Sequence, residues 1–395
     1  MDAKTLAAAE KDYILEQRHY FHAHPELGRE EKNTTAHIVE ELTKMGIPVQ
    51  TFPDITGCVG TIEGAKGPGK TLMLRADIDA LPIQEADTTK AYASQNPGVM
   101  HACGHDCHTA MLLGAAKILS THRDAFPGKV KLLFQMGEEI GTESRHYVEK
   151  GCLDDVDAIF GMHIWALLEA GTANLEDGER MACSDRFTIT ITGQPALSDA
   201  PEQGADPIAA AASVVLGLQQ LVSRKNDPEN TFVLTVGMMN SDGEQKGHLA
   251  RSVQLVGTTR TFNKAFRKTL PQRIEKVAKA IGEGLDCQVD CTYFFGPAPL
   301  INEHKELNDL GRAAVTEVMG TRALVPMEKQ MGAEDFSVYM EKVPGVFMFL
   351  GARNEKKGIC CVHHHPAFEV DEDVLPYGTG IEAAFAVDYL NGHTS

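Results

Sequence analysis

Short apolar runs alternate with amphipathic stretches through the first half of the chain. Residues 1–45 carry helical periodicity, interrupted at His24-Pro25-Glu26, and residues 109–119 place apolar side chains at helical spacing. Short apolar runs predict buried strands at 71–75, 130–134 and 158–162. Because strands that alternate with helices form sheets covered on both faces, this half predicts an α/β sheet.

The pattern changes near Cys183. Residues 187–192 alternate strictly between apolar and polar side chains, which is typical of a half-buried strand. The elements that follow are a helix at 207–222, strands at 231–236 and 252–259, a helix at 266–284 and a strand at 287–294. This order predicts an inserted ferredoxin-like α+β unit of about 110 residues. The α/β pattern then resumes, with a further strand at 346–350, so we predict a discontinuous domain at 1–183 and 298–395 around an insertion at 184–297.

Composition narrows the class of protein. A chain of 395 residues predicts two to three domains at about 150 residues each. The 55 acidic residues exceed the 37 lysines and arginines, and the resulting net charge of −18 argues against nucleic acid and anionic membranes as partners. We expect no membrane span and no signal peptide, hence a cytoplasmic protein. Its nine cysteines are then expected to be free thiols or metal ligands.

Four segments collect side chains that bind metals. The densest is His101-Ala-Cys-Gly-His-Asp-Cys-His108, in which Gly104 permits a tight turn between two donors. Glu138-Glu139 follows a predicted strand, His163 stands at the end of another, and a histidine cluster at 362–368 is expected just after a further apolar strand. Each segment alone has a simpler interpretation, such as a polar helix cap, a solvated acidic loop or a structural histidine. Together they offer thiolate, imidazole and carboxylate ligands, a mixture that suits zinc, manganese, cobalt or nickel, and more donors than one tetrahedral ion needs. We therefore predict two divalent ions that share a bridging water.

With these motifs in place, the chain resembles the dinuclear metallopeptidases of the aminoacylase and carboxypeptidase type. It is most similar to the amidohydrolase branch that contains hippurate hydrolases, N-acyl-amino-acid amidohydrolases and auxin-conjugate hydrolases. The resemblance rests on Arg18, His24-Pro25-Glu26, Leu74-Arg-Ala-Asp-Ile-Asp-Ala-Leu-Pro82, His364-His-Pro-Ala-Phe368 and Glu372, beside the metal motifs. It implies a zinc-exopeptidase-like α/β catalytic domain with an inserted ferredoxin-like lid domain through which two copies form a homodimer.

The resemblance also assigns roles residue by residue. Cys103 resembles the bridging metal ligand, and the other ligands are His105, Glu139, His163 and His364. Glu138 resembles the general base, which takes a proton from the water that attacks the amide carbonyl and passes it to the leaving amine. Asp77 is expected to support the ligands. Arg260, Met331 and Gly332 resemble residues of the lid and the substrate pocket.

The lid departs from the family pattern. Members usually carry a histidine that reaches the neighbouring active site of the dimer, but Leu197 stands at that position and cannot donate a hydrogen bond. His248 stands where the family usually has an asparagine. We hypothesise that His248 supplies a donor to the reaction, the alternative being an ordinary surface histidine. The segment after Glu139 also lacks the family's run of small residues, so Arg145 or His146 could contact an unusual substrate group.

These observations predict a metal-dependent amidohydrolase that acts on an N-acyl amino acid or a related small conjugate. Two alternatives stay open. The same metal site could cleave another C–N bond in an aryl amine, ureido or amidine substrate, which the changes in the lid would favour. The chain could also be a catalytically silent homologue that binds metal, although the intact Glu138 argues against this.

Overall fold

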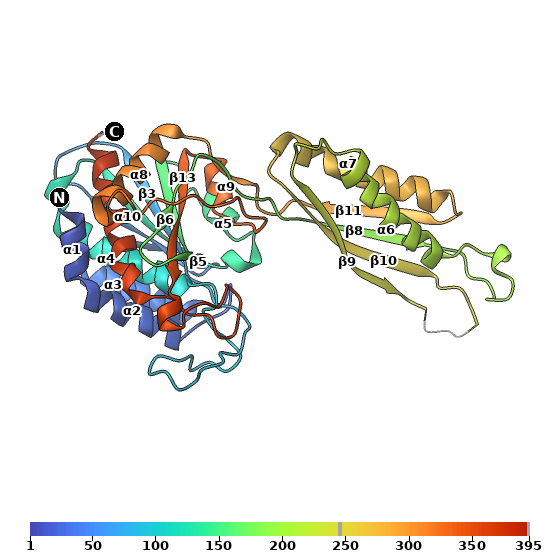
Figure 1. Ribbon diagram of the computed structural model, residues 1–395, viewed down its shortest axis with the longest axis horizontal. Coiled ribbons are helices and arrows are strands. Elements are labelled where there is room, and N and C mark those ends of the chain that lie inside the picture. The colour runs from blue at the N-terminus through green and yellow to red at the C-terminus, as the bar shows by residue number, and fades with distance from the viewer. Residues whose placement is uncertain (244–246, 393–395) are drawn as a thin grey trace. The chain divides into compact units, whose positions relative to one another are not determined.

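The structure is a computed structural model that describes residues 1–243 and 247–392 (Figure 1). The chain divides into two units, described here one at a time. The first comprises Met1–Gly178, Asn302–Glu328 and Val338–Ser395, and the second comprises Glu179–Ile301 and Lys329–Ser337. The sequence predicts an insertion at 184–297, whereas the main segment of the second unit runs from residue 179 to residue 301. Residues 329–337 also belong to the second unit.

A seven-stranded sheet in the order β1-β2-β4-β3-β5-β13-β6 forms the centre of the first unit. Its strands are β1 (Val49–Thr51), β2 (Cys58–Glu63), β3 (Thr71–Asp77), β4 (Lys129–Gln135), β5 (Ala158–Glu169), β6 (Ala173–Asn174) and β13 (Gly345–Arg353). The four strands β4, β3, β5 and β13 are parallel, whereas the strands at both edges are antiparallel. Every residue of β3 is buried, as the continuous apolar runs of a covered parallel sheet require.

Helices pack on this sheet and on one another. The most deeply buried are α4 and α10, which contact each other, and α2 packs on α4. The helices are α1 (Ala3–Ala9), α2 (Lys11–Ala23), α3 (Lys32–Lys44), α4 (His105–Thr121), α5 (Ser144–Glu149), α8 (Lys305–Met319), α9 (Ser337–Met340) and α10 (Leu375–Leu390). Single 3-10 turns occur at η1 (Arg123–Ala125), η2 (Glu138–Ile140), η4 (Glu355–Lys357) and η5 (Glu372–Val374).

Two details of the sequence prediction need correction. His163 does not end its strand, because β5 continues to Glu169 by pairing with β13. The β3–β5 register nevertheless pairs Arg75 with Gly161, which places His163 level with the last residue of β3. The histidine cluster does not directly follow a strand either, since β13 ends at Arg353 and η4 intervenes.

The second unit is an antiparallel sheet with two helices. Its strand order, β11-β8-β10-β9, is that of a ferredoxin-like fold, and Figure 1 shows both helices on one side of the sheet. A separate core lies between the two layers, with Phe187, Leu218 and Ile274 among its members. The elements are β8 (Asp185–Thr192), α6 (Pro207–Arg224), β9 (Phe232–Ser241), β10 (Ser252–Thr261), α7 (Lys264–Glu283) and β11 (Gln288–Phe294). Nearby lie the turn η3 (Pro201–Gln203) and the short pair β7 (Gly178–Met181) and β12 (Leu300–Asn302).

The two sheets together confirm the predicted fold class, an α/β domain with an inserted ferredoxin-like α+β domain. All nine cysteines are free thiols. Within the described ranges, none of the helices combines the length and apolar character that a bilayer crossing requires.

Candidate metal centre

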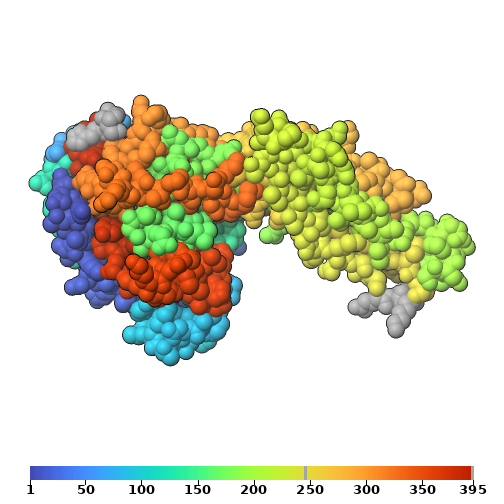
Figure 2. All heavy atoms as spheres, viewed as in Figure 1, coloured from blue at the N-terminus to red at the C-terminus, as the bar shows by residue number. Residues whose placement is uncertain are grey.

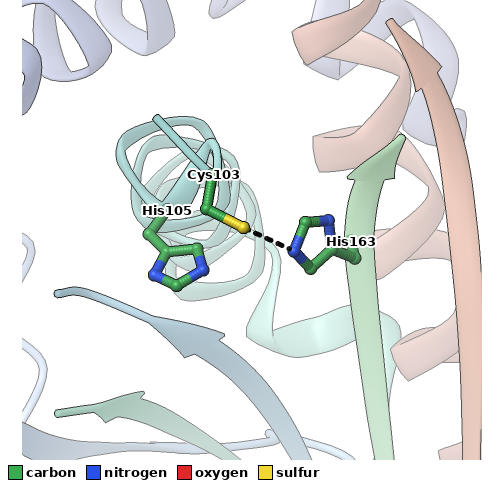
Figure 3. A group of neighbouring side chains, drawn as sticks. All are labelled: Cys103, His105 and His163. Atoms are coloured by element: carbon green, nitrogen blue, oxygen red, sulfur yellow. Dashed lines mark hydrogen bonds between the residues drawn. The ribbon is translucent and has the colours of Figure 1, made fainter. Parts of the chain in front are cut away.

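The six residues predicted for metal binding and proton transfer gather in the first unit. Their donor atoms form three overlapping groups, each with its atoms within 4.8 Å of one another. The groups are Cys103 with His105 and His163, Cys103 with Glu139 and His364, and His105 with Glu138 and Glu139. Figure 3 shows the first group, in which the side chains converge from the start of α4 and from β5. Cys103, His105 and Glu139 each belong to two of these three groups.

Cys103 and His105 are held by the turn that begins α4. Gly104 between them has a φ of 95°, a left-handed conformation that strains any residue with a Cβ. The Nδ1 of His105 donates to the backbone carbonyl of Asp79 at 2.9 Å, so its Nε2 faces the cluster as the potential ligand. That Nε2 is buried and has no hydrogen-bond partner among the residues that the structure describes.

His163 is oriented in the same way. Its Nδ1 donates to the carbonyl of Ile164, which leaves Nε2 as the acceptor atom, 3.5 Å from the Sγ of Cys103. Burial and the neighbouring imidazoles of His108 and His363 hold its pKa well below the usual range, so the ring is neutral. A neutral imidazole whose Nε2 carries a lone pair is the form that binds a metal ion.

Glu138 and Glu139 lie on η2, directly after β4. Gly137 before the pair and Gly141 after it both have positive φ, 62° and 79°, which turns the chain sharply at each end. Asp79 accepts from both backbone N–H groups, with Oδ1 3.0 Å from that of Glu138 and Oδ2 3.1 Å from that of Glu139. The two carboxylates are thereby fixed side by side in the same cluster.

Of the three consecutive histidines, the geometry selects His364. Its Nε2 lies 3.1 Å from the Oε1 of Glu139, and its backbone has a φ of 64°, an uncommon conformation for a residue with a side chain. His363 instead accepts the N–H of Ala166 at 3.0 Å, and His365 accepts the N–H of Ala367. The neighbouring histidines are therefore already engaged by the backbone.

The charge of the cluster is that of a cation site. Burial opposes protonation of His105, but Asp77 and Asp79 outweigh it and raise the pKa to about 10. Burial, followed by the carboxylates of Glu139 and Glu138, raises the pKa of the Cys103 thiol well above its usual range. Divalent cations would replace both protons and relieve the repulsion between buried acids. The donor set therefore fits metal ions.

Asp77 accepts hydrogen bonds from two side chains next to the cluster. It is fully buried, its Oδ2 accepts from Arg75 at 2.7 Å, and its Oδ1 accepts from the Nδ1 of His108 at 2.6 Å. The Nε2 of His108 accepts the N–H of Ile164 at 2.8 Å, so neither nitrogen of His108 is left for a metal. His108 thus connects Asp77 to the strand that carries His163.

Two supporting residues escaped the sequence analysis. Asp79 fixes His105, Glu138 and Glu139 together, and the Asp-x-Asp spacing that pointed to Asp77 could have indicated it. No comparable pattern distinguishes His363, which is one of three adjacent histidines.

The remaining predicted residues belong to other elements. Arg260 is in β10, Met331 and Gly332 are in the segment 329–337, and all three belong to the second unit. His248 is exposed and also belongs to the second unit. Their predicted roles stay predictions. In the first unit, Arg145 and His146 lie on α5, with His146 half-exposed beside Glu143.

Comparison with known proteins agrees with this fold and cluster. A sequence profile of peptidase family M20/M25/M40 matches residues 73–388, and the chain belongs to this family. It is 38% identical to the N-acetyl-L-cysteine deacetylase of Bacillus subtilis over 94% of this chain and 86% of that protein. It is 37% identical to the IAA-amino acid hydrolase ILR1-like 4 of Arabidopsis thaliana over 96% of this chain and 86% of that one.

A solved structure extends the comparison. The YXEP protein of Bacillus subtilis, described as a dinuclear metal-binding peptidase of the M20 family, superposes with a TM-score of 0.84. The two sequences are 34% identical, and the match covers 97% of this chain and 99% of that one. The expectation of a hydrolase of the dinuclear metallopeptidase class is confirmed.

Proposed function

We propose that the protein is a metal-dependent amidohydrolase that cleaves the amide bond of an N-acyl amino acid or a related small conjugate. The observation that carries the proposal is the convergence of three donor groups on Cys103, His105 and Glu139, with a second carboxylate, Glu138, in the same cluster. Similarity to an N-acetyl-L-cysteine deacetylase and to an IAA-amino acid hydrolase supports this substrate class.

Two divalent ions, zinc, manganese, cobalt or nickel, fit this donor set best. Cys103, His105, Glu139, His163 and His364 would hold them, since these residues make up the groups that bring three potential ligand atoms close together. When bound, such ions lower the pKa of a coordinated water and polarise a carbonyl oxygen.

Glu138 is the proton carrier in this proposal. It is 8% exposed. Its backbone N–H donates a hydrogen bond to Asp79, which fixes the turn that carries the Glu138 carboxylate. The carboxylate takes a proton from water as the water oxygen attacks the amide carbon, and then gives that proton to the departing amine nitrogen. His364 is the most exposed of the proposed ligands, with 51% of its side chain accessible.

His248 is proposed as the lid donor that replaces the missing family histidine. Leu197 and His248 are partners in an antiparallel β-bridge. Two backbone hydrogen bonds flank the bridge, from the N–H of Ser198 to the carbonyl of Gly247 and from the N–H of Leu249 to the carbonyl of Ala196. This pattern defines a non-hydrogen-bonded pair, whose side chains lie on the same face with Cα atoms about 4.5 Å apart. The imidazole of His248 therefore emerges beside the position where the family carries its histidine.

A homodimer through the second unit accompanies this proposal. Strand β9 is an edge of its sheet, contains no charged residue and exposes Val233 and Met239 by 41% and 44%. The adjoining helix α6 exposes Leu216 by 71%. An uncharged apolar edge strand is a pairing site, and a second copy of the same strand can complete it. Cytoplasmic location, which we expect because the sequence shows neither the pattern of a membrane span nor that of a signal peptide, stays part of the proposal.

The decisive experiment compares the two adjacent acids, Glu138→Gln and Glu139→Gln. Glu138→Gln should keep wild-type metal content and lose at least about 100-fold in kcat on N-acetyl and N-benzoyl amino acids, because it removes only the proton carrier. Glu139→Gln should lose metal affinity as well. Metal content by elemental analysis and turnover by amine release measure both effects. Full activity in Glu138→Gln would refute the mechanism.

The substrate panel also separates the alternatives. The changed lid, with Leu197 and His248, favours hydrolysis of another C–N bond as the second candidate. Turnover of ureido, amidine or aryl amide substrates without turnover of N-acyl amino acids would establish that candidate. A wild-type protein that binds metal yet hydrolyses none of these substrates would be the silent homologue.

A further inference from the structure

We propose that Arg18 is a positioning residue that clamps the two metal-binding segments together. It belongs to α2 and is 1% exposed. The inference rests on the proposed metal site, but it concerns a residue that contacts none of the predicted ligands. Its guanidinium contacts carboxylates from two segments, one adjoining Cys103 and His105 and the other adjoining His364.

Each arm of the guanidinium has its own carboxylate. The Nε donates to the Oδ2 of Asp106 at 3.0 Å, the Nη2 to Glu369 at 2.7 Å and the Nη1 to Glu372 at 2.8 Å. Asp106 immediately follows His105, and Glu369 lies five positions after His364. The pairing therefore joins the first turn of α4 to the segment that carries His364.

Further charges surround this clamp. His22, also on α2, lies with Nδ1 2.8 Å from the same Asp106 oxygen and with Nε2 3.1 Å from Glu85. Lys90 donates to the second oxygen of Glu369 at 2.6 Å. Lys90 and Glu85 thus join the segment 82–99 to the clamp, Lys90 through Glu369 and Glu85 through His22. Figure 2 shows that segment against the chain around residues 355–370. The backbone N–H of Ala86 also donates to Pro366 at 2.9 Å.

The chemistry of arginine explains why this residue is placed here. Its planar fork presents donors in three directions, so one side chain can pair with three separate acids, whereas lysine offers a single point charge. The ring of Tyr92 covers the guanidinium at 4.8 Å and helps to exclude water. Removal of one partner from a buried ion network leaves uncompensated charge, here the carboxylates of Asp106, Glu369 and Glu372.

The consequence is a link between the clamp and metal affinity. His364 and His105 belong to different donor groups around Cys103, so both segments must keep their spacing for the complete cluster to form. When Arg18 is removed, repulsion between Asp106 and Glu369 separates the segments. The ligands themselves remain chemically intact, so excess metal ion can still fill the site.

The test measures metal affinity of the full chain for Arg18→Met and Arg18→Lys, by competition with a chromophoric chelator for Zn²⁺ and Mn²⁺. Arg18→Met should weaken binding at least tenfold, and Arg18→Lys by less. Saturating metal should restore kcat to within about threefold, with KM little changed. The matched control is Arg267→Met, which removes a buried arginine that pairs with Asp185 in the second unit. It should lower thermal stability without changing metal affinity.

Unchanged metal affinity in Arg18→Met, or a loss of kcat that saturating metal does not restore, would overturn the proposal. If Arg18→Met fails to fold, Arg18→Lys decides: wild-type affinity in that variant also overturns it. Metal affinity is measured without substrate. A wild-type protein that hydrolyses no amide would therefore refute the proposed function and leave the result on Arg18 interpretable.

Discussion

At the residue scale, our proposal gives His248 the role of a hydrogen-bond donor from the lid. Its bridge to Leu197 places its imidazole beside a side chain that cannot donate a hydrogen bond. If His248 stabilises the developing oxyanion, His248→Ala should lower kcat at least tenfold with little change in metal content. His248→Asn, which restores a residue with a donor, should retain more activity. Equal rates for the wild type and His248→Ala would dismiss this role.

A second prediction at this scale concerns Glu31. Its carboxylate is fully buried, with Oε1 accepting the N–H of Gly137 at 2.8 Å and Oε2 accepting the hydroxyl of Thr56 at 2.5 Å. Burial raises its pKa from 4.5 to about 7, and Asp79 adds to the rise. Between these values the folded protein binds more protons than the unfolded chain, so this group's contribution to stability falls as pH rises from 4.5 to about 7.

Glu31→Gln removes this dependence. The free energy of unfolding of Glu31→Gln, measured relative to that of the wild type, should be higher at pH 7.5 than at pH 4.5, by at most about 3 kcal/mol. Denaturant unfolding at the two pH values measures the difference, with the exposed neighbour Glu30→Gln as the control for loss of one carboxyl. Parallel stability curves for Glu31→Gln and the wild type would contradict the prediction.

The sequence predicted the candidate metal ligands better than it predicted the residues that hold those ligands in place. Cys103, His105 and Glu139 were recognisable because thiol, imidazole and carboxylate groups in short, distinctive motifs are rare without a metal. Asp79 was missed because its contacts with the backbone N–H groups of η2 form only in the folded chain, although the Asp-x-Asp spacing that pointed to Asp77 could have indicated it. The clamp of Arg18 was missed because its acids lie 88 to 354 positions away in the chain.

At the scale of elements, periodicity located the helices and strands but not their limits. The end of β5 was placed too early because its extension depends on pairing with β13, which is nearly 200 residues away. The predicted start of α4 at Thr109 was four residues late, since Gly104 starts the helix at His105 through its left-handed conformation. Both errors concern contacts or backbone angles that a hydrophobic pattern does not contain.

The exposed edge of the second unit carries the prediction that belongs to this scale. Met239→Lys on β9 and Leu216→Lys on α6 would place charge on the apolar surface that we propose pairs two copies. We expect each variant to shift the protein from dimer to monomer in sedimentation velocity. Leu285→Lys is the matched control, since its side chain is also exposed by 44% but lies beyond α7. A wild-type protein that is already monomeric would refute the dimer.

At the scale of the whole molecule, all proposed metal ligands lie in one unit and each unit has its own core. Ligand binding stabilises only the part that folds around it, by about 2.7 kcal/mol at 100 times Kd. Chelation should therefore lower the melting temperature of the first unit by several degrees and leave the second unit nearly unchanged.

Calorimetry of the full chain, with hydrogen exchange to assign each transition, measures this difference. After chelation, protection should fall around the start of α4 and around η2, while β8 and α6 in the second unit keep theirs. Cys103→Ser provides the control, because a variant that already lacks the shared ligand should respond little to the chelator. Equal loss of protection in both units would mean that metal binding stabilises the chain as one cooperative body. No loss in either unit would mean that the cluster is folded without metal and gains no stability from it.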